Sequence, residues 1–266
     1  MSDRPLLGRV ALVTGGGRGI GRGIAEALAR DGCSVALHDR LVSPELAALA
    51  DQLARTHAVR CVALAGDLAL PGSAETLFRD FDRAFAHIDI LVNNAGYETT
   101  AAAEHMPESD WRGVIEVNLT APFLLSQQAA RRMGERGGVI VNLSSIHAHV
   151  PRKGLANYAA AKAGLAMLTK ALGLEWAEFG IRVVSVSPGA IETDMNREAI
   201  ETFGRDQFEH WIPARRVGAV SDVADIVAFL CSDRASYVTG TDVLVDGGYA
   251  LNLVRYDDRP ARRGQG

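Results

Sequence analysis

The sequence predicts an α/β fold in which seven parallel strands form one doubly wound sheet. Short runs rich in valine, isoleucine and leucine alternate along the chain with longer alanine-rich stretches of helical periodicity. The apolar runs are continuous, as in strands that helices cover on both faces. Strands separated by helices pair in parallel through crossover connections. The 266 residues contain no linker or repeat, so we expect a single domain.

The boundaries of the expected elements follow from apolar runs, glycines and capping residues. Ser43 is suited to open the second helix as its N-cap, and Gly32 to close the first. The predicted strands span residues 9–15, 34–40, 60–67, 88–96, 138–145, 181–189 and 242–248. The predicted helices span residues 19–32, 43–57, 73–87, 110–133 and 221–230, with a further helix that carries Tyr158. We assign residues 1–254 to the domain and 255–266 to a C-terminal tail.

Composition excludes several classes of function. The net charge of -4 and the pI near 6.0 provide no basic surplus for nucleic acid or for an anionic membrane. The 3 cysteines are scattered, which predicts free thiols in a reducing compartment and no metal site. The N-terminus lacks the apolar core of a secretory signal, and no apolar run approaches the roughly 20 residues that span a bilayer. We therefore expect a cytoplasmic protein that acts on a small molecule.

A glycine-rich loop, TGGGRGIG, joins the first strand to the first helix. Gly15, Gly19 and Gly21 are spaced GxxxGxG. Glycine at these positions allows a tight turn, close approach of the backbone to a pyrophosphate and close helix–strand packing, and the helix N-terminus provides N–H donors. The pattern alone is weak and also fits a plain tight turn. Its place in the first strand–helix unit favours a dinucleotide site that includes Arg18 and Ile20.

The end of the second strand indicates which dinucleotide is preferred. Asp39 lies about 20 residues past the glycine loop, where a carboxylate can accept both hydrogen bonds of the adenosine ribose diol. The same carboxylate would repel a 2′-phosphate, so Asp39 favours NAD over NADP. Arg18 and Arg40 keep NADP open, because either guanidinium could bind that phosphate if Asp39 turned away.

Further polar groups follow the third and fourth strands. Asp67 is placed to reach the adenine amino group, although an aspartate that caps its own loop fits equally. The NNAG segment, residues 93–96, follows the fourth strand. Its amides can tie neighbouring loops together, and Gly96 can admit a ligand. Doubly wound sheets bind ligands at such strand ends.

The segment NYAAAK places Tyr158 and Lys162 four residues apart, on one face of a helix. A tyrosine ring packed on a lysine stem is the ordinary interpretation of this pair. Beside a nicotinamide, the pair gains a chemical role: Tyr158 exchanges a proton with a substrate hydroxyl while hydride moves to the cofactor. The ammonium of Lys162, together with the positive nicotinamide ring, would lower the pKa of the phenol towards neutrality. Ser145, which follows the fifth strand, would hold the substrate oxygen.

These motifs together resemble the short-chain dehydrogenase/reductase superfamily. The resemblance rests on TGxxxGxG, NNAG, Asn118 in VNLT, Ser145 thirteen residues before Tyr158, YxxxK, and SPGAIETDM, in that order. It extends from about residue 7 to residue 251 and implies a Rossmann fold. It also implies that Asn118, Ser145, Tyr158 and Lys162 form a catalytic tetrad, in which Asn118 bends its helix and holds a water next to Lys162.

The resemblance completes the set of expected cofactor residues. Pro188, Gly189, Ile191 and Thr193 correspond to the segment that binds the nicotinamide carboxamide. The full expected set is Gly15, Arg18, Gly19, Ile20, Gly21, Asp39, Asp67, Leu68, Asn94, Ala95, Gly96, Tyr158, Lys162, Pro188, Gly189, Ile191 and Thr193.

Within the superfamily, the sequence is similar to glucose 1-dehydrogenase-like members. Glu98, His147 and Asn196 carry this likeness, and Glu98 and His147 would join Ser145 and Tyr158 at the mouth of the substrate site. Polar groups there suit a sugar or polyol. Glu98 also fits as an ordinary solvated charge in a loop, and His147 as a loop histidine that is hydrogen-bonded to the backbone.

Two alternatives stay open at this point. A 3-oxoacyl-carrier-protein reductase carries the same tetrad, although such reductases usually prefer NADP. An inactive nucleotide-binding module would be expected to lose the tyrosine, lysine or serine, and this chain keeps all three.

Residues 196–216 should form a lid over the substrate. Its Phe203, Phe208, His210 and Trp211 suggest an apolar wall.

We also expect a homotetramer with 222 symmetry, because the helices of residues 110–133 and of Tyr158 are apolar over more than one face.

Overall fold

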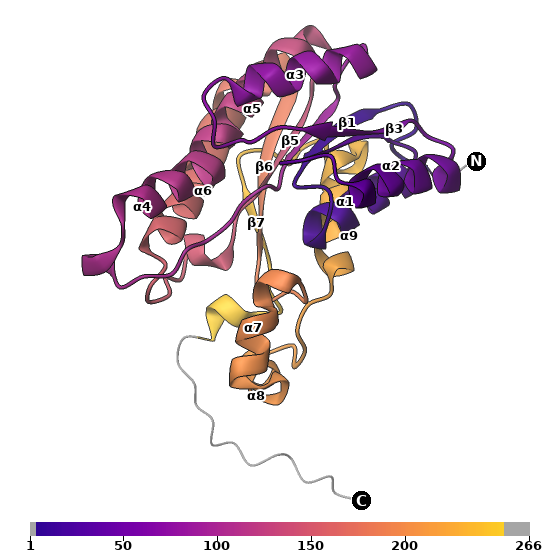
Figure 1. Ribbon diagram of the computed structural model, residues 1–266. Helices are drawn as coiled ribbons and strands as arrows, with labels where there is room; N and C mark the ends of the chain where they lie inside the picture. The colour runs from indigo at the N-terminus through magenta and orange to yellow at the C-terminus, as the bar shows by residue number, and fades with distance from the viewer. Residues whose placement is uncertain (1–3, 253–266) are drawn as a thin grey trace, which may run out of the picture.

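The structure, a computed structural model, describes residues 4–252 and confirms the predicted seven-stranded parallel sheet (Figure 1). The strand order is β3-β2-β1-β4-β5-β6-β7, and every pair is parallel. The strands are β1 (Val10–Thr14), β2 (Ser34–Asp39), β3 (Cys61–Ala65), β4 (Ile90–Asn93), β5 (Gly138–Leu143), β6 (Ile181–Pro188) and β7 (Asp242–Val245). The order reverses between β1 and β4, which is where doubly wound sheets bind ligands. The expected tail, residues 255–266, lies outside the described residues.

Helices cover both faces of the sheet (Figure 1). The helices are α1 (Gly19–Arg30), α2 (Pro44–His57), α3 (Ser73–Ala84), α4 (Glu108–Ile115), α5 (Ala121–Met133), α6 (Ala156–Glu175), α7 (Asp194–Phe203), α8 (Arg205–Trp211) and α9 (Val220–Cys231). One core packs α1, α2 and α9 against the sheet, through residues such as Ile24, Leu49 and Val223. The other packs α3, α5 and α6 through Phe78, Leu125 and Leu172. Burial on both faces explains the continuous apolar runs of the strands.

Two predicted helices differ in detail. The helix expected over 73–87 ends at Ala84, because Phe85 is extended and its ring is buried in the second core. The helix expected over 110–133 begins at Glu108 and is interrupted by a π-turn at Glu116–Thr120. At this turn the Ala121 N–H donates to Glu116 O, five residues back. Pro122, which follows, has no N–H for the carbonyl four residues back.

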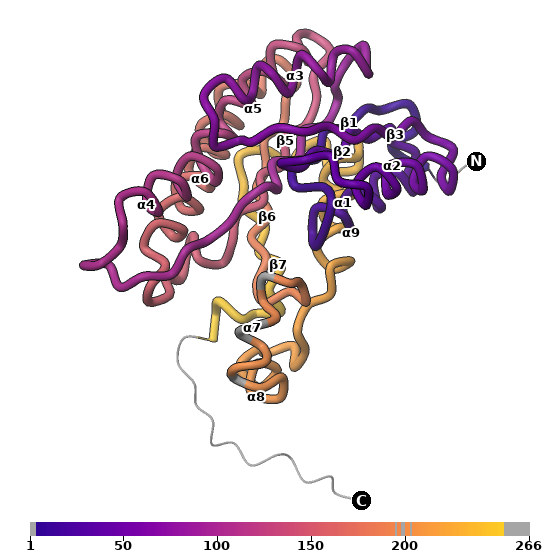
Figure 2. Tube along the Cα trace, in the orientation of Figure 1, coloured from indigo at the N-terminus to yellow at the C-terminus, as the bar shows by residue number. Residues whose placement is uncertain are grey.

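The predicted lid forms a separate pair of short helices. Figure 2 shows α7 and α8 beyond the ends of β6 and β7, away from the helix layers. They pack around their own small cluster, which includes Ile200, Phe208 and Ile212. Within residues 4–252, no helix has the length and apolar character needed to cross a membrane.

Candidate active site

The glycine loop between β1 and α1 is built for contact through its backbone. Gly15 and Gly19 have φ of 62° and 52°, in the left-handed region that favours glycine. A Cβ on Gly21 would lie 2.1 Å from Gly15 O, so any larger residue would break the turn. Arg18 is the N-cap of α1 and offers no side-chain hydrogen bond to the first turn. The N–H groups of that turn are therefore available to an anion such as a pyrophosphate.

The segment after β4 holds this loop in place. Asn94 Nδ2 donates to Thr14 O at 2.9 Å and to Gly15 O at 3.0 Å. Thr14 Oγ1 accepts from the backbone N–H groups of Asn94 and Ala95, both at 3.0 Å. The expectation that the NNAG amides tie neighbouring loops is confirmed. Thr14 was not singled out from the sequence, although it precedes the glycine loop directly.

Asp39 lies against the glycine loop, as an acceptor for a ribose must. Its Oδ1 accepts from Arg40 N at 2.7 Å, and a Cβ on Gly17 would lie 2.8 Å from its Oδ2. Arg18 and Arg40 are both exposed. Asp67 Oδ1 caps its own loop by accepting from Ala69 N at 3.0 Å, which is the alternative considered from the sequence.

Some of the expected cofactor residues can bind the cofactor only through their backbone groups. The side chains of Leu68 and Ile191 are buried in the two cores. Gly189 packs against β7, where an added Cβ would lie 2.7 Å from Asp246 Cβ. Thr193 lies next to Gly19 across the loop, so the expected nicotinamide segment does meet the glycine loop.

Tyr158, Ser145 and Lys162 come together at the carboxyl end of β5. The Ser145 side chain is close enough to the Tyr158 hydroxyl to lower the pKa of the phenol. Lys162 Nζ lies 5.4 Å from the centroid of the Tyr158 ring and donates to Leu143 O at 2.7 Å. The lysine side chain is therefore held by β5, and its ammonium lies over the face of the ring. Asn157, which precedes Tyr158, accepts from Tyr158 N at 2.7 Å and donates to Thr99 Oγ1 at 2.8 Å, which fixes the start of α6.

Burial sets the protonation of this pair. It raises the pKa of Tyr158 well above the usual value; the charge of Glu98 acts in the same direction, and the Ser145 side chain opposes both. Burial lowers the pKa of Lys162 to about 8. The expected lowering of the Tyr158 pKa by Lys162 and the nicotinamide ring together stays a prediction. Lys162 Nζ bonds to a backbone carbonyl, and burial is the largest influence on the pKa of the phenol.

Asn118 lies in the π-turn and is fully buried. Its Nδ2 donates to Tyr97 O at 2.9 Å and Val114 O at 3.0 Å, while its Oδ1 has no hydrogen-bond partner among residues 4–252. A Cβ on Gly96 would lie 2.5 Å from Asn118 Oδ1 and 3.5 Å from Lys162 Nζ. Gly96 therefore makes room for Asn118 beside Lys162. The unpaired oxygen is a site at which a water or ligand donor can bind.

The residues that carry the likeness to glucose 1-dehydrogenases divide into two groups. Glu98 is close enough to affect the pKa of Tyr158, and the His147 ring meets the Tyr158 ring edge-on with centroids 6.4 Å apart. His147 Nδ1 donates to Val150 O at 2.9 Å, which is the backbone bond considered from the sequence. Asn196 instead bonds to the cofactor segment, since its Nδ2 donates to Ile191 O at 2.8 Å. In the lid, the Phe208 ring contacts the Trp211 ring, and it also contacts the ring of Tyr249, which follows β7.

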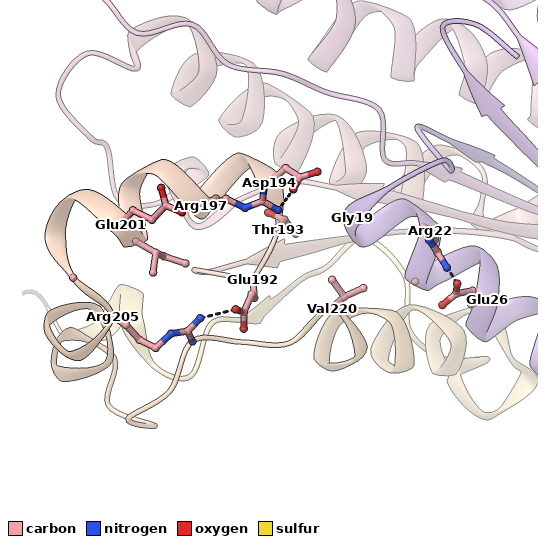
Figure 3. A pocket seen from close by; sticks show the side chains of 13 residues that line it. Gly19, Arg22, Glu26, Glu192, Thr193, Asp194, Arg197, Glu201, Arg205 and Val220 are labelled. Atoms are coloured by element: carbon pink, nitrogen blue, oxygen red, sulfur yellow. Dashed lines mark hydrogen bonds and ion pairs between the residues drawn. The ribbon is translucent and has the colours of Figure 1, made fainter. Parts of the chain in front are cut away.

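A cavity lies away from Tyr158, at the glycine-loop end of the site. It has a volume of about 810 Å³ and is bounded by α1, α7 and the start of α9 (Figure 3). Of the expected site residues, Gly19 and Thr193 line it. Its charged walls are paired within the protein, as in Arg205–Glu192 and Arg22–Glu26. The cavity thus extends the cofactor site outward between the glycine loop and the lid, and it does not include the catalytic residues.

A row of buried side-chain hydrogen bonds beneath the site was not predicted from the sequence. Asn93 Nδ2 donates to Asn142 Oδ1 at 2.8 Å, and Asn142 Nδ2 donates to Thr169 Oγ1 at 2.9 Å. Asn93 also reaches Ser126 Oγ at 3.2 Å. These hydrogen bonds link β4 and β5 to α5 and α6, so they fix the helix of Tyr158 against the sheet. The asparagines inside apolar strand runs were their only sequence signal.

Known proteins are similar to this chain in sequence and in fold. The profile of a family described as enoyl-(acyl carrier protein) reductase matches residues 15–250. The 3beta-hydroxysteroid dehydrogenase 1 of Eggerthella lenta is 39% identical over 92% of this chain and 95% of its own length. The 3-oxoacyl-[acyl-carrier-protein] reductase FabG of Escherichia coli is 40% identical over 91% of this chain and 97% of its own. The crystal structure of a gluconate 5-dehydrogenase from Burkholderia cenocepacia, in complex with NADP and tartrate, superposes with a TM-score of 0.87 and 34% identity over 94% and 98% of the two chains.

The chain belongs to the short-chain dehydrogenase/reductase family. It is accordingly an NAD(P)-dependent oxidoreductase that acts on hydroxyl or keto groups. The residues present fit such a cofactor. The first turn of α1 is uncapped, Gly21 permits the tight turn that brings the loop against Asn94, and Asp39 lies against that loop.

Proposed function

We propose that this enzyme interconverts a secondary alcohol and a carbonyl on a small polar substrate, with a sugar or polyol as the first candidate. The observation that carries the proposal is the position of Tyr158 beside Ser145, which lowers the pKa of the phenol, and beside the buried Lys162. Two hydroxyls held together can both meet one substrate oxygen. The bound nicotinamide supplies or accepts the hydride.

Each residue of the tetrad then has a distinct task. Tyr158 gives a proton to the substrate oxygen in reduction and takes it in oxidation, while Ser145 orients that oxygen. The raised pKa keeps the phenol protonated at neutral pH, which is the form that donates during reduction. In the oxidising direction the positive charge of Lys162 favours loss of that proton. Asn118 Oδ1, unpaired beside Lys162, is suited to hold a water that exchanges protons with it.

For the cofactor, we propose a preference for NAD. The Asp39 carboxylate lies against the glycine loop, where it would accept from a ribose diol and repel a 2′-phosphate. The related gluconate 5-dehydrogenase was crystallised with NADP, and the exposed Arg18 and Arg40 keep that cofactor accessible to this chain. Comparing kcat/KM for NAD and NADP decides the preference.

A polar substrate is supported by the groups around the phenol. Glu98 and His147 both lie near Tyr158, and they can bond to further hydroxyls of a polyol. The second candidate is a 3-oxoacyl thioester, which the FabG relative at 40% identity favours. The aromatic cluster of Phe208, Trp211 and Tyr249 in the lid suits the apolar part of such a chain.

The test is turnover at the absorbance band of the reduced nicotinamide, with a panel of glucose, gluconate, acetoin, acetoacetyl coenzyme A and a 3-hydroxysteroid. Tyr158→Phe should bind cofactor as the wild type does and lose about 10²-fold or more of kcat, because it removes only the proton-transferring hydroxyl. Tyr237→Phe is the matched control, since Tyr237 is fully exposed. A Tyr158→Phe enzyme with near-wild-type turnover would refute the assignment.

A further inference from the structure

A buried carboxylate joins the edge strand β7 to its neighbour β6. Asp242 is the first residue of β7, and its side chain is only 7% exposed. Its Oδ1 accepts from Ser185 Oγ at 2.6 Å, and its Oδ2 accepts from Ser187 Oγ at 2.8 Å. A third donor, His149 Nε2, reaches Oδ2 at 2.6 Å. Three donors around one buried group suit an ionised carboxylate, which only accepts.

This arrangement is unusual for its position. An edge strand needs apolar or solvated side chains, and a buried carboxylate is costly unless donors surround it. The two serines lie on the same face of β6, two residues apart. The two serines donate to Asp242 from within the sheet, and His149 donates to it from a loop outside the sheet. The contact between His149 and Asp242 is therefore part of a complete hydrogen-bonded unit.

His149 belongs to the loop that carries Ser145. Ser145 Oγ accepts from His147 N at 3.1 Å, and Ser145 O accepts from Ala148 N at 2.9 Å. His149 N donates to Ile146 O at 2.9 Å. These short-range bonds make residues 145–149 one compact turn. A restraint on the His149 ring is consequently a restraint on the Ser145 hydroxyl.

Ser187, at the other end of the unit, directly precedes the expected nicotinamide segment. Pro188 and Gly189 continue from it, and Gly189 N donates to Val245 O on β7 at 3.0 Å. Asp242 thus contacts the turn that holds the substrate oxygen and the strand that leads to the hydride-transferring end of the cofactor site. The relative position of these two segments determines the geometry of the reaction.

We propose that His149 and Asp242 are positioning residues that hold the Ser145 turn at a fixed place relative to the Pro188–Thr193 segment. The proposal rests on the proposed function, because it assigns the substrate oxygen to Ser145. Neither residue needs to touch substrate or cofactor. Their effect is on kcat through placement of Ser145.

The test compares variants at the two ends of the unit. His149→Ala removes the outer donor from a side chain that is 40% exposed. His149→Gln keeps an N–H donor of similar reach, and Ser187→Ala removes a donor from the sheet. His87→Ala is the matched control, because it breaks another His–Asp contact, His87 Nε2–Asp89 Oδ2 at 3.2 Å, just before β4 at the opposite end of the sheet. Turnover is measured with the panel substrate that the wild type converts fastest.

His149→Ala should lower kcat about tenfold, with the melting temperature and the affinity for reduced nicotinamide, followed by its fluorescence, close to wild type. His149→Gln should recover most of the turnover. The double variant with Ser187→Ala should lose less than the product of the two single losses. Amide hydrogen exchange over residues 145–149 should accelerate in His149→Ala, and this readout requires no substrate.

The idea fails if His149→Ala leaves exchange over 145–149 unchanged, or if its kcat equals that of wild type or of His87→Ala. It also fails if His149→Gln is as slow as His149→Ala. An unaffected His149→Ala with an inactive Tyr158→Phe would overturn this proposal and leave the proposed function standing. An active Tyr158→Phe would overturn the proposed function, and the exchange result would then still decide whether His149 restrains the turn.

Discussion

The glycine loop and the Tyr158 site lie at the same edge of the sheet and are built in opposite ways. Around the loop, the side-chain polar groups of Thr14 and Asn94 find partners within the chain. Around Tyr158, Asn118 Oδ1 is buried without a partner, and the Lys162 ammonium bonds to a carbonyl in place of a carboxylate. The side chains that hold the glycine loop thus have their hydrogen bonds before a ligand binds, whereas the Tyr158 site keeps polar groups without full hydrogen-bond or charge partners.

The difference separates binding from chemistry. A preformed loop binds a pyrophosphate without reorganising, which preserves affinity. An uncompensated ammonium costs stability but retains its full electrostatic effect for the reaction. Substitutions in the loop should therefore damage the fold and cofactor affinity together. Substitutions at the Tyr158 site should damage turnover while leaving stability equal or higher.

The largest effect is expected for Gly21→Ala. Its Cβ would lie 2.1 Å from Gly15 O and 2.4 Å from Asn94 Nδ2, so both the turn and the bond that ties it must move. We expect a loss of about 3 kcal/mol of unfolding free energy and at least 10²-fold weaker cofactor binding, measured by denaturant titration and nucleotide fluorescence. Gly66→Ala is the control, since its Cβ would meet only the His38 ring, at 3.4 Å. Equal effects of the two variants would contradict a role for close packing in the loop.

Lys162→Met should show the opposite combination. The buried lysine loses solvation, which lowers its pKa from 10.5 to about 8. Each pKa unit corresponds to about 1.4 kcal/mol, so removing the charge should raise the free energy of unfolding at pH 7 by about 3 kcal/mol. The kcat should fall about 10²-fold, because the proton transfer at Tyr158 loses its neighbouring charge. A destabilised Lys162→Met would mean that the ammonium is better compensated than its contacts indicate.

The pH dependence gives a second check on Lys162. Below pH 8 the folded lysine is charged and bears the full desolvation cost. Between pH 8 and 10.5 the unfolded chain holds the proton and the folded chain does not, so stability rises with pH through this contribution. The stability advantage of Lys162→Met over wild type should therefore shrink from pH 7 to pH 9.5. A constant difference between the two unfolding curves would show that Lys162 does not titrate in this range.

The same contrast explains what could be predicted from the sequence. Glycine spacing and strand ends follow from local geometry, so the seven strands and the loop residues were predictable. The resemblance alone indicated the bend at Asn118, which the π-turn confirms. The raised pKa of Tyr158 depends on packing between α6 and β5, which periodicity does not encode. The contact of His149 with Asp242 joins residues 93 positions apart, and nothing local indicates it.

A smaller effect is expected at the adenosine end. Asp39→Ala removes the carboxylate that faces the glycine loop and leaves the exposed Arg18 and Arg40 free to meet a phosphate. The ratio of kcat/KM for NAD to that for NADP should fall about tenfold, which corresponds to about 1.4 kcal/mol. Asp51→Ala, on the exposed side of α2, is the control. A wild type that already prefers NADP strongly would show that Asp39 does not set the preference.

The outer face of α6 provides the last comparison, because the same helix presents Tyr158 and Lys162 on its buried side. Met167 and Leu174 are 62% and 82% exposed, and a spacing of seven places them on one face. Exposed apolar side chains of this size favour contact with a second copy of the chain.

We expect a homotetramer in which α4, α5 and α6 pair across one twofold axis and the edge strand β7 lies at another. Leu174→Lys should break the α6 contact and reduce the assembly to dimers, observed as mass by light scattering. Turnover should change less than threefold, since the catalytic face of α6 is held by the bonds of Lys162 and Asn157 within one chain. Leu7→Lys, which alters another exposed leucine outside α6 and the β7 edge, is the control. A wild-type mass near one 28.4 kDa chain at micromolar concentration would reject the tetramer. A wild-type dimer that Leu174→Lys leaves intact would place the one contact away from α6.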